Sequence, residues 1–115
     1  MKTGFGWVEI GGTRYERDVI IHADGRVSKR KKKPSKKYRE QYGHTPLSEG
    51  ELGLLAKEQP DIVYVGLGQD GALPVTPRAE ALVAHYHGIR KPTPEILPLL
   101  EAENRRYVAI LHVTC

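Results

Sequence analysis

A glycine-rich stretch is the first pattern in the sequence with chemical meaning, because residues 66–71 read Gly-Leu-Gly-Gln-Asp-Gly. This is the G-x-G-x-x-G spacing of dinucleotide-binding turns, whose glycines let the backbone approach a pyrophosphate. The surroundings do not fit such a site: the next helix is expected only at Pro77, and no acid stands ~20 residues further on to hold a ribose. We therefore interpret residues 66–71, here called the glycine turn, as a tight turn that needs the positive φ values glycine tolerates.

The glycine turn has a second interpretation, as a site for a small ligand or an anion. Successive backbone N–H groups in a turn can form a nest for an anion. The turn also follows a predicted buried strand, and ligands of open α/β sheets bind at the carboxyl ends of strands. On this interpretation Gln69 and Asp70 are the polar lining, and the ligand-binding residues are Gly66, Gly68, Gln69, Asp70 and Gly71.

Positive charge is concentrated in one part of the chain. Residues 26–40, here called the basic segment, hold nine lysines and arginines and one acid, a charge of +8. The other residues sum to −4, so the whole chain carries +4. Such a cluster is typical of a surface that binds an acidic protein or an acidic ligand. We predict a basic surface formed by Lys29, Arg30, Lys31, Lys32, Lys33, Lys36 and Lys37.

The basic segment has two alternative interpretations. It could bind nucleic acid, with Tyr38 and Tyr42 stacking on bases, although no known nucleic-acid-binding motif accompanies it. It could also be a solvated hairpin and loop whose lysines discourage strand pairing between molecules. A protein partner is the interpretation that we carry forward, and nucleic acid is the less favoured one.

The few cysteine and histidine residues suggest little catalytic chemistry. His112 and Cys115 stand three residues apart and could act as the base and the thiol nucleophile of a covalent mechanism. The alternative, which we favour, is a strand end whose small residues pack inside the fold. His85 and His87 are two residues apart on a predicted helix, so they lie on opposite sides and cannot chelate a metal together. We expect no metal and no cofactor and assign no catalytic residue, which leaves enzymatic activity undecided.

The N-terminal part of the chain is predicted to hold the basic segment in a β-meander. Residues 5–10 and 13–22 have strand character and are separated by two glycines, a signal for a tight hairpin turn. The chain turns again at residues 23–25, and residues 26–30 begin a third strand. Residues 31–43 show no apolar periodicity and are predicted to be a loop.

Helices and strands alternate in the remainder of the chain. Residues 48–51 read Ser-Glu-Gly-Glu, a capping box that predicts a helix, and Pro60 ends it. Residues 61–66 form a near-continuous apolar run, which is typical of a strand covered on both faces. Thr76 and Pro77 are an N-cap and a first helical residue, and they predict the start of a second helix.

The last elements are shorter or less clearly bounded. Gly88 suits the C′ position after the second helix, and residues 89–91 can form only a short strand. A third helix is capped by Thr93 if it starts there, but Pro98 lacks an N–H that the helix would use and favours a start near itself. Residues 107–111 are predicted to be a last buried strand.

This order of elements predicts a single α/β domain, residues 1–115, with three layers around a mixed central β-sheet. A chain of 115 residues with 39% apolar composition can bury a core of its own. Its single cysteine excludes an internal disulfide, and no apolar run approaches the ~20 residues of a membrane span. No secretory signal or mitochondrial presequence is apparent, so we expect a cytoplasmic protein without a membrane partner.

Four short segments resemble one small protein family, in the same order along the chain. They are residues 22–25 (His-Ala-Asp-Gly), 29–33 (Lys-Arg-Lys-Lys-Lys), 66–73 and 111–115 (Leu-His-Val-Thr-Cys). The sequence resembles the single-domain family that includes a mitochondrial complex I assembly factor and an adipogenesis-associated domain protein. The resemblance covers essentially the whole chain and implies a three-layer α/β fold, with protein binding and assembly rather than catalysis as the role. It assigns no catalytic residue, and the strand after Gly88 is shorter than the family pattern implies.

The sequence therefore predicts a non-enzymatic protein-binding or assembly-type module that uses a basic surface. The alternative, from a different functional class, is a small-molecule or anion-binding protein, and even an enzyme, with its site at the glycine turn.

Overall fold

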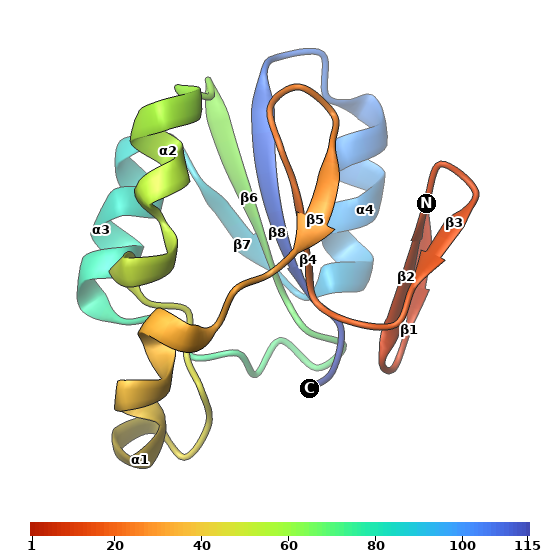
Figure 1. Ribbon diagram of the computed structural model, residues 1–115. Helices are drawn as coiled ribbons and strands as arrows, with labels where there is room; N and C mark the ends of the chain where they lie inside the picture. The colour runs from red at the N-terminus through yellow and green to blue at the C-terminus, as the bar shows by residue number, and fades with distance from the viewer.

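A five-stranded mixed sheet forms the centre of the computed structural model, which describes residues 1–115. Its strands lie in the order β5-β4-β8-β6-β7 (Figure 1). Strand β6 is parallel to both β8 and β7, whereas β4 is antiparallel to β8 and β5. The mixed central sheet predicted from the sequence is therefore confirmed. The strands are β4 (Val19–Ile21), β5 (Val27–Lys29), β6 (Ile62–Leu67), β7 (Ile89–Lys91) and β8 (Tyr107–His112).

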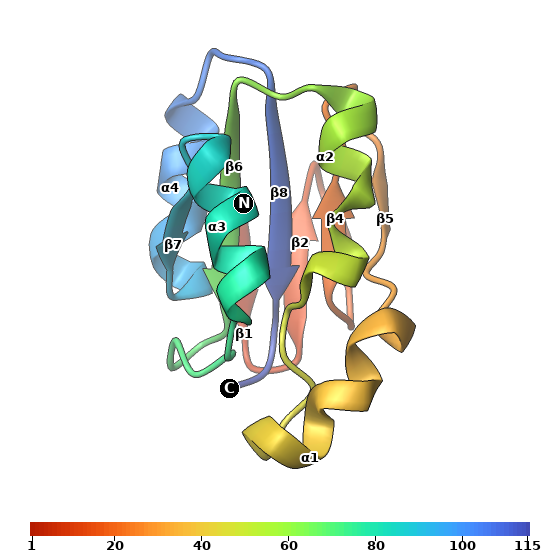
Figure 2. The same ribbon diagram turned by 90° about the vertical axis from the view of Figure 1, so that its left-hand side faces the viewer.

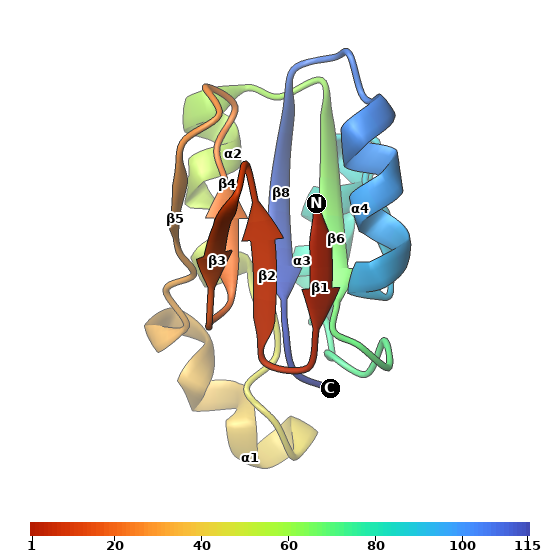
Figure 3. The ribbon, with the colours of Figure 1, turned by 90° about the vertical axis from the view of Figure 1, so that its right-hand side faces the viewer.

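Two layers cover the faces of this sheet. Helices α2 (Gly53–Glu58) and α3 (Pro77–His85) lie on one face (Figure 2). Helix α4 (Thr93–Ala102) and a small antiparallel sheet lie on the other (Figure 3). Each face has its own buried apolar cluster of 11 residues, which explains why β6 and β8 are apolar on both sides. The three-layer prediction is confirmed.

The predicted N-terminal meander is divided between two sheets. Strands β1 (Lys2–Gly4), β2 (Trp7–Ile10) and β3 (Thr13–Tyr15) form the small sheet, whereas β4 and β5 join the central one. The single strand predicted over residues 13–22 is therefore wrong, because it is broken between β3 and β4. Asp18 lies in that break with its carboxylate buried and bonded to Arg30 and His112, which draws the chain across to the central sheet.

The loop predicted over residues 31–43 is largely helical. The 3-10 helix η1 (Lys33–Tyr38) leads into the one-turn helix α1 (Arg39–Tyr42), which ends at Gly43 with a φ of 74°. Only Ser35 is buried in this stretch, so it shows no apolar periodicity even though its backbone is helical.

The capping box predicted at residues 48–51 does not form. Its residues make a short 3-10 helix, η2 (Glu49–Glu51), and α2 begins only at Gly53. The Ser48 hydroxyl bonds to Ser35, and the Glu51 carboxylate accepts from Arg30 instead of turning back to the cap. Long-range partners have replaced the local bonds. The helix ends at Glu58, two residues before Pro60.

Helix α3 has the predicted start but a different end. The Thr76 hydroxyl accepts from the Ala79 N–H at 3.3 Å, which confirms the N-cap. His87, not Gly88, adopts the left-handed conformation at the C-terminal end, with a φ of 58°. Gly88 is the following residue, and its N–H donates to the Val83 carbonyl at 2.8 Å, as in a Schellman motif.

Helix α4 begins at Thr93 rather than near Pro98. Pro98 lies inside the helix on its exposed side, where the missing N–H costs least, while Ile96, Leu97 and Leu100 pack on the sheet. Thr93 does not act as a side-chain cap, because its hydroxyl donates to the His112 carbonyl at 2.6 Å. Strand β7 is short, as predicted, and no helix of the structure is long and apolar enough to cross a membrane.

Candidate functional site

Arg30 is a buried anchor of the basic segment, not part of its surface. The residue is 2% exposed, so its predicted surface role is wrong. Its guanidinium donates to Asp18 Oδ2 at 2.9 Å, to Glu51 Oε1 at 2.7 Å and to the Pro46 carbonyl at 3.1 Å. A buried charge needs such partners, because burial without them is very costly. Burial opposes the charge, but Glu51 and Asp18 outweigh it and hold the pKa of Arg30 above its usual value.

The partners of Arg30 are themselves connected to several other elements. Glu51 accepts a short hydrogen bond from the Ser35 hydroxyl, which places the start of η1 against η2. Asp18 accepts from His112 Nδ1 at 2.7 Å and from the Val113 N–H at 2.9 Å. Burial would raise the pKa of Asp18, but the bonds from His112 and Val113 hold it far below its usual value. The basic segment is therefore fixed to the sheet through buried ion pairs.

The lysines around Arg30 stand mostly in solvent. Lys32 is half-buried, with its ammonium 3.5 Å from Asp18 Oδ2. The other five make no ion pair within 4.0 Å, and all are exposed; they are Lys29, Lys31, Lys33, Lys36 and Lys37. We use the name exposed lysines for these five residues. Five of the seven residues of the predicted basic surface are thus exposed lysines, which flank a buried arginine in the sequence.

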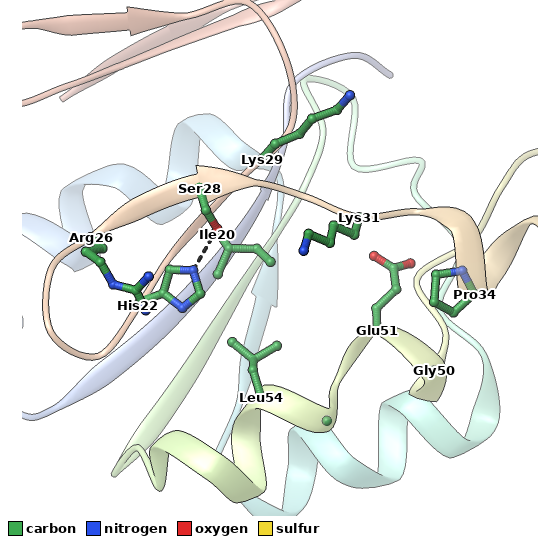
Figure 4. Close-up of a pocket in the computed structure, with 11 residues that line it drawn as sticks. Ile20, His22, Arg26, Ser28, Lys29, Lys31, Pro34, Gly50, Glu51 and Leu54 are labelled. Carbon is green, nitrogen blue, oxygen red and sulfur yellow. Dashed lines mark hydrogen bonds between the residues drawn. The ribbon is translucent and has the colours of Figure 1, made fainter.

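A pocket of about 460 Å³ lies between the basic segment and α2. Figure 4 shows the Lys31 side chain running back across this pocket toward Ile20, which lies on its sheet side with Leu54 facing it from α2. Two polar side chains of the β4–β5 hairpin, His22 and Ser28, also face the space. The remaining lining residues are Arg26, Lys29, Pro34, Gly50, Glu51 and Gly53.

His22 connects a serine to a carboxylate at the side of this pocket. Its Nε2 lies 2.6 Å from Ser28 Oγ, and its Nδ1 lies 2.6 Å from Glu58 Oε2. The register explains the first contact: Ser28 pairs with Ile20, and His22 lies two residues beyond Ile20 on the same face. Glu58 comes from the last residue of α2, and its Oε1 accepts from the Ala23 N–H at 2.8 Å. The side chains of His22 and Glu58 are only 13% and 16% exposed.

The Glu58 carboxyl is held in its ionised form. Partial burial opposes ionisation, but the hydrogen bonds from the His22 ring and the Ala23 N–H outweigh it and lower the pKa of Glu58. A carboxylate only accepts hydrogen bonds, so the imidazole proton lies on Nδ1. The Nε2 lone pair is then left to accept the proton of the Ser28 hydroxyl.

The glycine turn is occupied by the chain itself. Gly68 and Gly71 have φ values of 96° and 71°, which confirms the tight-turn interpretation. The N–H groups of Gln69, Asp70 and Ala72, however, donate to the Thr114 and Cys115 carbonyls at 2.7, 3.2 and 3.0 Å. The nest predicted for an anion is therefore filled by the segment 114–115.

The other predicted ligand-binding groups of the glycine turn are also engaged. The Gly68 N–H donates to Thr93 Oγ1 at 3.0 Å, and a Cβ on Gly66 would lie 2.6 Å from the same hydroxyl oxygen. The Gln69 amide donates to Thr3 at 3.1 Å, and Asp70 points to solvent. No residue of the glycine turn lines the pocket beneath the basic segment, so the two predicted sites lie apart.

His112 does not pair with Cys115. Both of its ring nitrogens have other partners, Asp18 at 2.7 Å and the Thr114 hydroxyl at 3.1 Å, and the ring is buried. The thiol and its proposed base are therefore not paired, and Thr114 and Cys115 follow the end of β8 as half-buried residues rather than packing fully inside the fold.

The residues His22, Ser28 and Glu58 were not identified as a group from the sequence. No pattern in the sequence connects His22 to Glu58, which lies 36 residues away from it along the chain. Only the packing of α2 against the β4–β5 hairpin brings the three together.

Proteins similar to this chain are found among solved structures. No protein-family model matches the sequence, and neither does any curated protein. The structure is similar to that of the conserved hypothetical protein PH1505 from Pyrococcus horikoshii OT3, with 36% sequence identity and a TM-score of 0.86 over 100% of this chain and 98% of that one. It is also similar to MT938, with 31% identity and a TM-score of 0.74 over 100% of this chain and 96% of that one.

Proposed function

The chain belongs to the same family as PH1505, and we propose that it is a protein-binding, assembly-type module that takes an acidic partner on its exposed lysines. The burial of Arg30 is the observation that carries this proposal. Arg30 holds the backbone of the basic segment against the sheet, so the exposed lysines are attached to a fixed backbone. A preordered backbone loses less conformational entropy when a partner binds.

The charge of this surface is not neutralised within the chain. The exposed lysines make no ion pair, whereas the two buried acids of this region, Asp18 and Glu51, are already bound to Arg30. An uncompensated patch of one sign attracts a partner of the other sign and speeds its association.

An acidic protein fits this surface better than a nucleic acid does. The Tyr38 hydroxyl donates to Glu49 at 3.1 Å, and the Lys37 ammonium lies over its ring at 5.3 Å, so the ring is no free platform for a base. The alternative, a ligand or anion site at the glycine turn, is less favoured because the backbone N–H groups of that turn already donate to residues 114–115. We propose the cytoplasm as the location, since the single cysteine of this sequence cannot form an internal disulfide.

Charge reversal tests the proposed surface. The double variant Lys33→Glu/Lys36→Glu should weaken binding of a labelled oligoglutamate peptide at low salt by about tenfold or more, because it replaces attraction with repulsion. Fluorescence anisotropy measures the affinity. The matched control is Lys57→Glu/Lys91→Glu, which changes the net charge equally at two exposed lysines elsewhere.

Two results would contradict the proposal. If both double variants lose affinity equally, the peptide responds only to net charge. The other result is an oligonucleotide of the same length that binds more tightly than the peptide. If that binding is lost in Lys33→Glu/Lys36→Glu but kept in the control variant, the surface binds nucleic acid.

A further inference from the structure

We propose that Ser28, His22 and Glu58 form a hydrolytic site for small carboxylic esters that carry a negative charge. This inference does not depend on the proposed binding of an acidic protein. It rests on the arrangement of three side chains at one wall of the pocket beneath the basic segment.

The three side chains have the order that a serine nucleophile needs. Ser28 and His22 face the pocket, as Figure 4 shows, and the hydroxyl oxygen lies 2.6 Å from Nε2. Glu58 lies on the other side of the imidazole, 2.6 Å from Nδ1, and does not line the pocket. An acid, a histidine and a serine linked in this way are recognised by geometry and not by their order in the chain.

The support for this arrangement is rigid. Ser28 lies in β5, which is paired with β4, and His22 is the first residue after β4. The second carboxylate oxygen of Glu58 is held by the Ala23 N–H at 2.8 Å, which fixes the acid relative to the hairpin. Catalytic groups on paired strands, with a supporting hydrogen bond behind them, are positioned more precisely than groups on loops.

Proton positions favour activation of the serine. The ionised Glu58 accepts from Nδ1–H, so in the neutral imidazole Nε2 carries the lone pair that can take the Ser28 proton. A histidine oriented by a carboxylate is the usual way to turn a weak hydroxyl into a nucleophile.

The pocket indicates the kind of substrate. Its volume of about 460 Å³ is within the range of small-molecule sites. Its apolar wall, Ile20 and Leu54, suits an acyl chain, and the Lys31 ammonium turned across it suits a carboxylate or phosphate on the same molecule (Figure 4). The one carboxylate in the lining, Glu51, is already paired with Arg30, so it adds little repulsion.

The reaction consumes only the ester and water. Ser28 Oγ attacks the ester carbonyl carbon while its proton moves to His22 Nε2, and the carbonyl oxygen takes the electron pair of the C=O π bond to form a tetrahedral oxyanion. The bond from carbon to the leaving oxygen then breaks, and that oxygen takes the proton from Nε2, which releases an alcohol. Water next attacks the acyl-serine and gives its proton to Nε2. Cleavage of the acyl–Oγ bond returns this proton to Ser28 and releases a carboxylic acid.

The first test is hydrolysis of 4-nitrophenyl hemisuccinate by the full chain, followed at the nitrophenolate absorbance. The Ser28→Ala variant should lose about 100-fold or more of the enzyme-dependent rate, because it removes the nucleophile. The Lys31→Met variant should lose more rate on this ester than on neutral 4-nitrophenyl butyrate, and Lys57→Met, at an exposed lysine outside the pocket, should lose none.

A second measurement covers the case in which Ser28→Ala does not fold. A fluorophosphonate probe should label the unmodified protein once, and mass spectrometry of the digested product should place the label on Ser28. Labelling elsewhere only, no labelling, or a hydrolysis rate unchanged in folded Ser28→Ala would overturn the proposal and leave these residues as a structural link. A folded Ser28→Ala that still binds oligoglutamate normally would separate this activity from the binding surface.

Discussion

Arg30 shows how one residue can decide the character of a whole segment. It is the second residue of the run 29–33, whose other four residues are lysines, but its guanidinium is buried between Asp18 and Glu51. The pair of carboxylates compensates the buried charge, and the backbone of the segment is fixed as a result.

Replacing Arg30 by methionine should destabilise the protein strongly. The change keeps an aliphatic side chain but leaves Glu51 without its main partner and Asp18 without one of its partners. Removal of one member of a buried ion pair costs about 3–5 kcal/mol. Urea unfolding at neutral pH measures the loss. The control is Arg26→Met, since Arg26 is two-thirds exposed and pairs only with exposed Asp24. Equal stability of both variants would mean that the buried network contributes nothing.

At the scale of elements, the path from α3 into β7 depends on close approach of the backbone. Helix α3 ends with His87 in the left-handed conformation, and the next residue, Gly88, lies directly against Val83. Glycine is required at position 88 because a side chain would collide with Val83, and not because the residue has a positive φ. The sequence suggested Gly88 for the second reason, as the left-handed C′ residue of the helix.

Two glycine substitutions separate these effects. In Gly88→Ala the new Cβ would lie 2.1 Å from Val83 Cγ1, so we expect a loss of about 1–3 kcal/mol from overpacking. In Gly53→Ala nothing lies within 4 Å of the new Cβ, so we expect a gain of about 0.4–1 kcal/mol from the reduced entropy of the unfolded chain. Thermal unfolding of both variants checks the opposite signs. A stable Gly88→Ala would show that the α3–β7 junction relaxes.

At the scale of the whole molecule, Asp18 connects parts of the chain that are far apart in sequence. It accepts from Arg30, His112 and the Val113 N–H, so it joins the basic segment to the last strand from a position between the two sheets. The stability of the fold should therefore depend on the charge of this carboxyl.

The free energy of unfolding should fall in acid, in part through Asp18. Burial opposes ionisation, but bonds from His112 and Val113 lower the pKa of Asp18 well below the ordinary 3.8. A group with a lowered pKa in the folded state stabilises it above the unfolded value, and this stability is lost as the pH falls toward the folded value. Between about pH 5 and about pH 2 the unmodified protein should thus lose more stability than Asp18→Asn does. Parallel pH curves, measured by urea unfolding, would contradict this.

Local signals in the sequence predicted those elements whose structure is specified by a few consecutive residues. The apolar run that became β6, the Thr76 cap of α3 and the short β7 were all found, because each signal lies within a few consecutive residues. Charge concentration in the basic segment was also visible, since composition does not depend on folding.

The candidate site could not be predicted in the same way. The capping box at residues 48–51 failed because Glu51 binds Arg30, 21 residues away in sequence, and helix η1 shows no apolar pattern because only Ser35 of it is buried. His22 gave no sign of its partners, as Ser28 and Glu58 are chosen by strand register and by the packing of α2.

The sequence by itself therefore determined the mixed α/β layering and the place of the positive charge, because hydrophobic periodicity, turn residues and composition act over short distances along the chain. Only the tertiary structure decided which of those charges are buried, what fills the glycine turn and which side chains meet at the pocket. Those outcomes depend on contacts between residues far apart in sequence, where a buried polar group takes whichever partner the packing brings within reach.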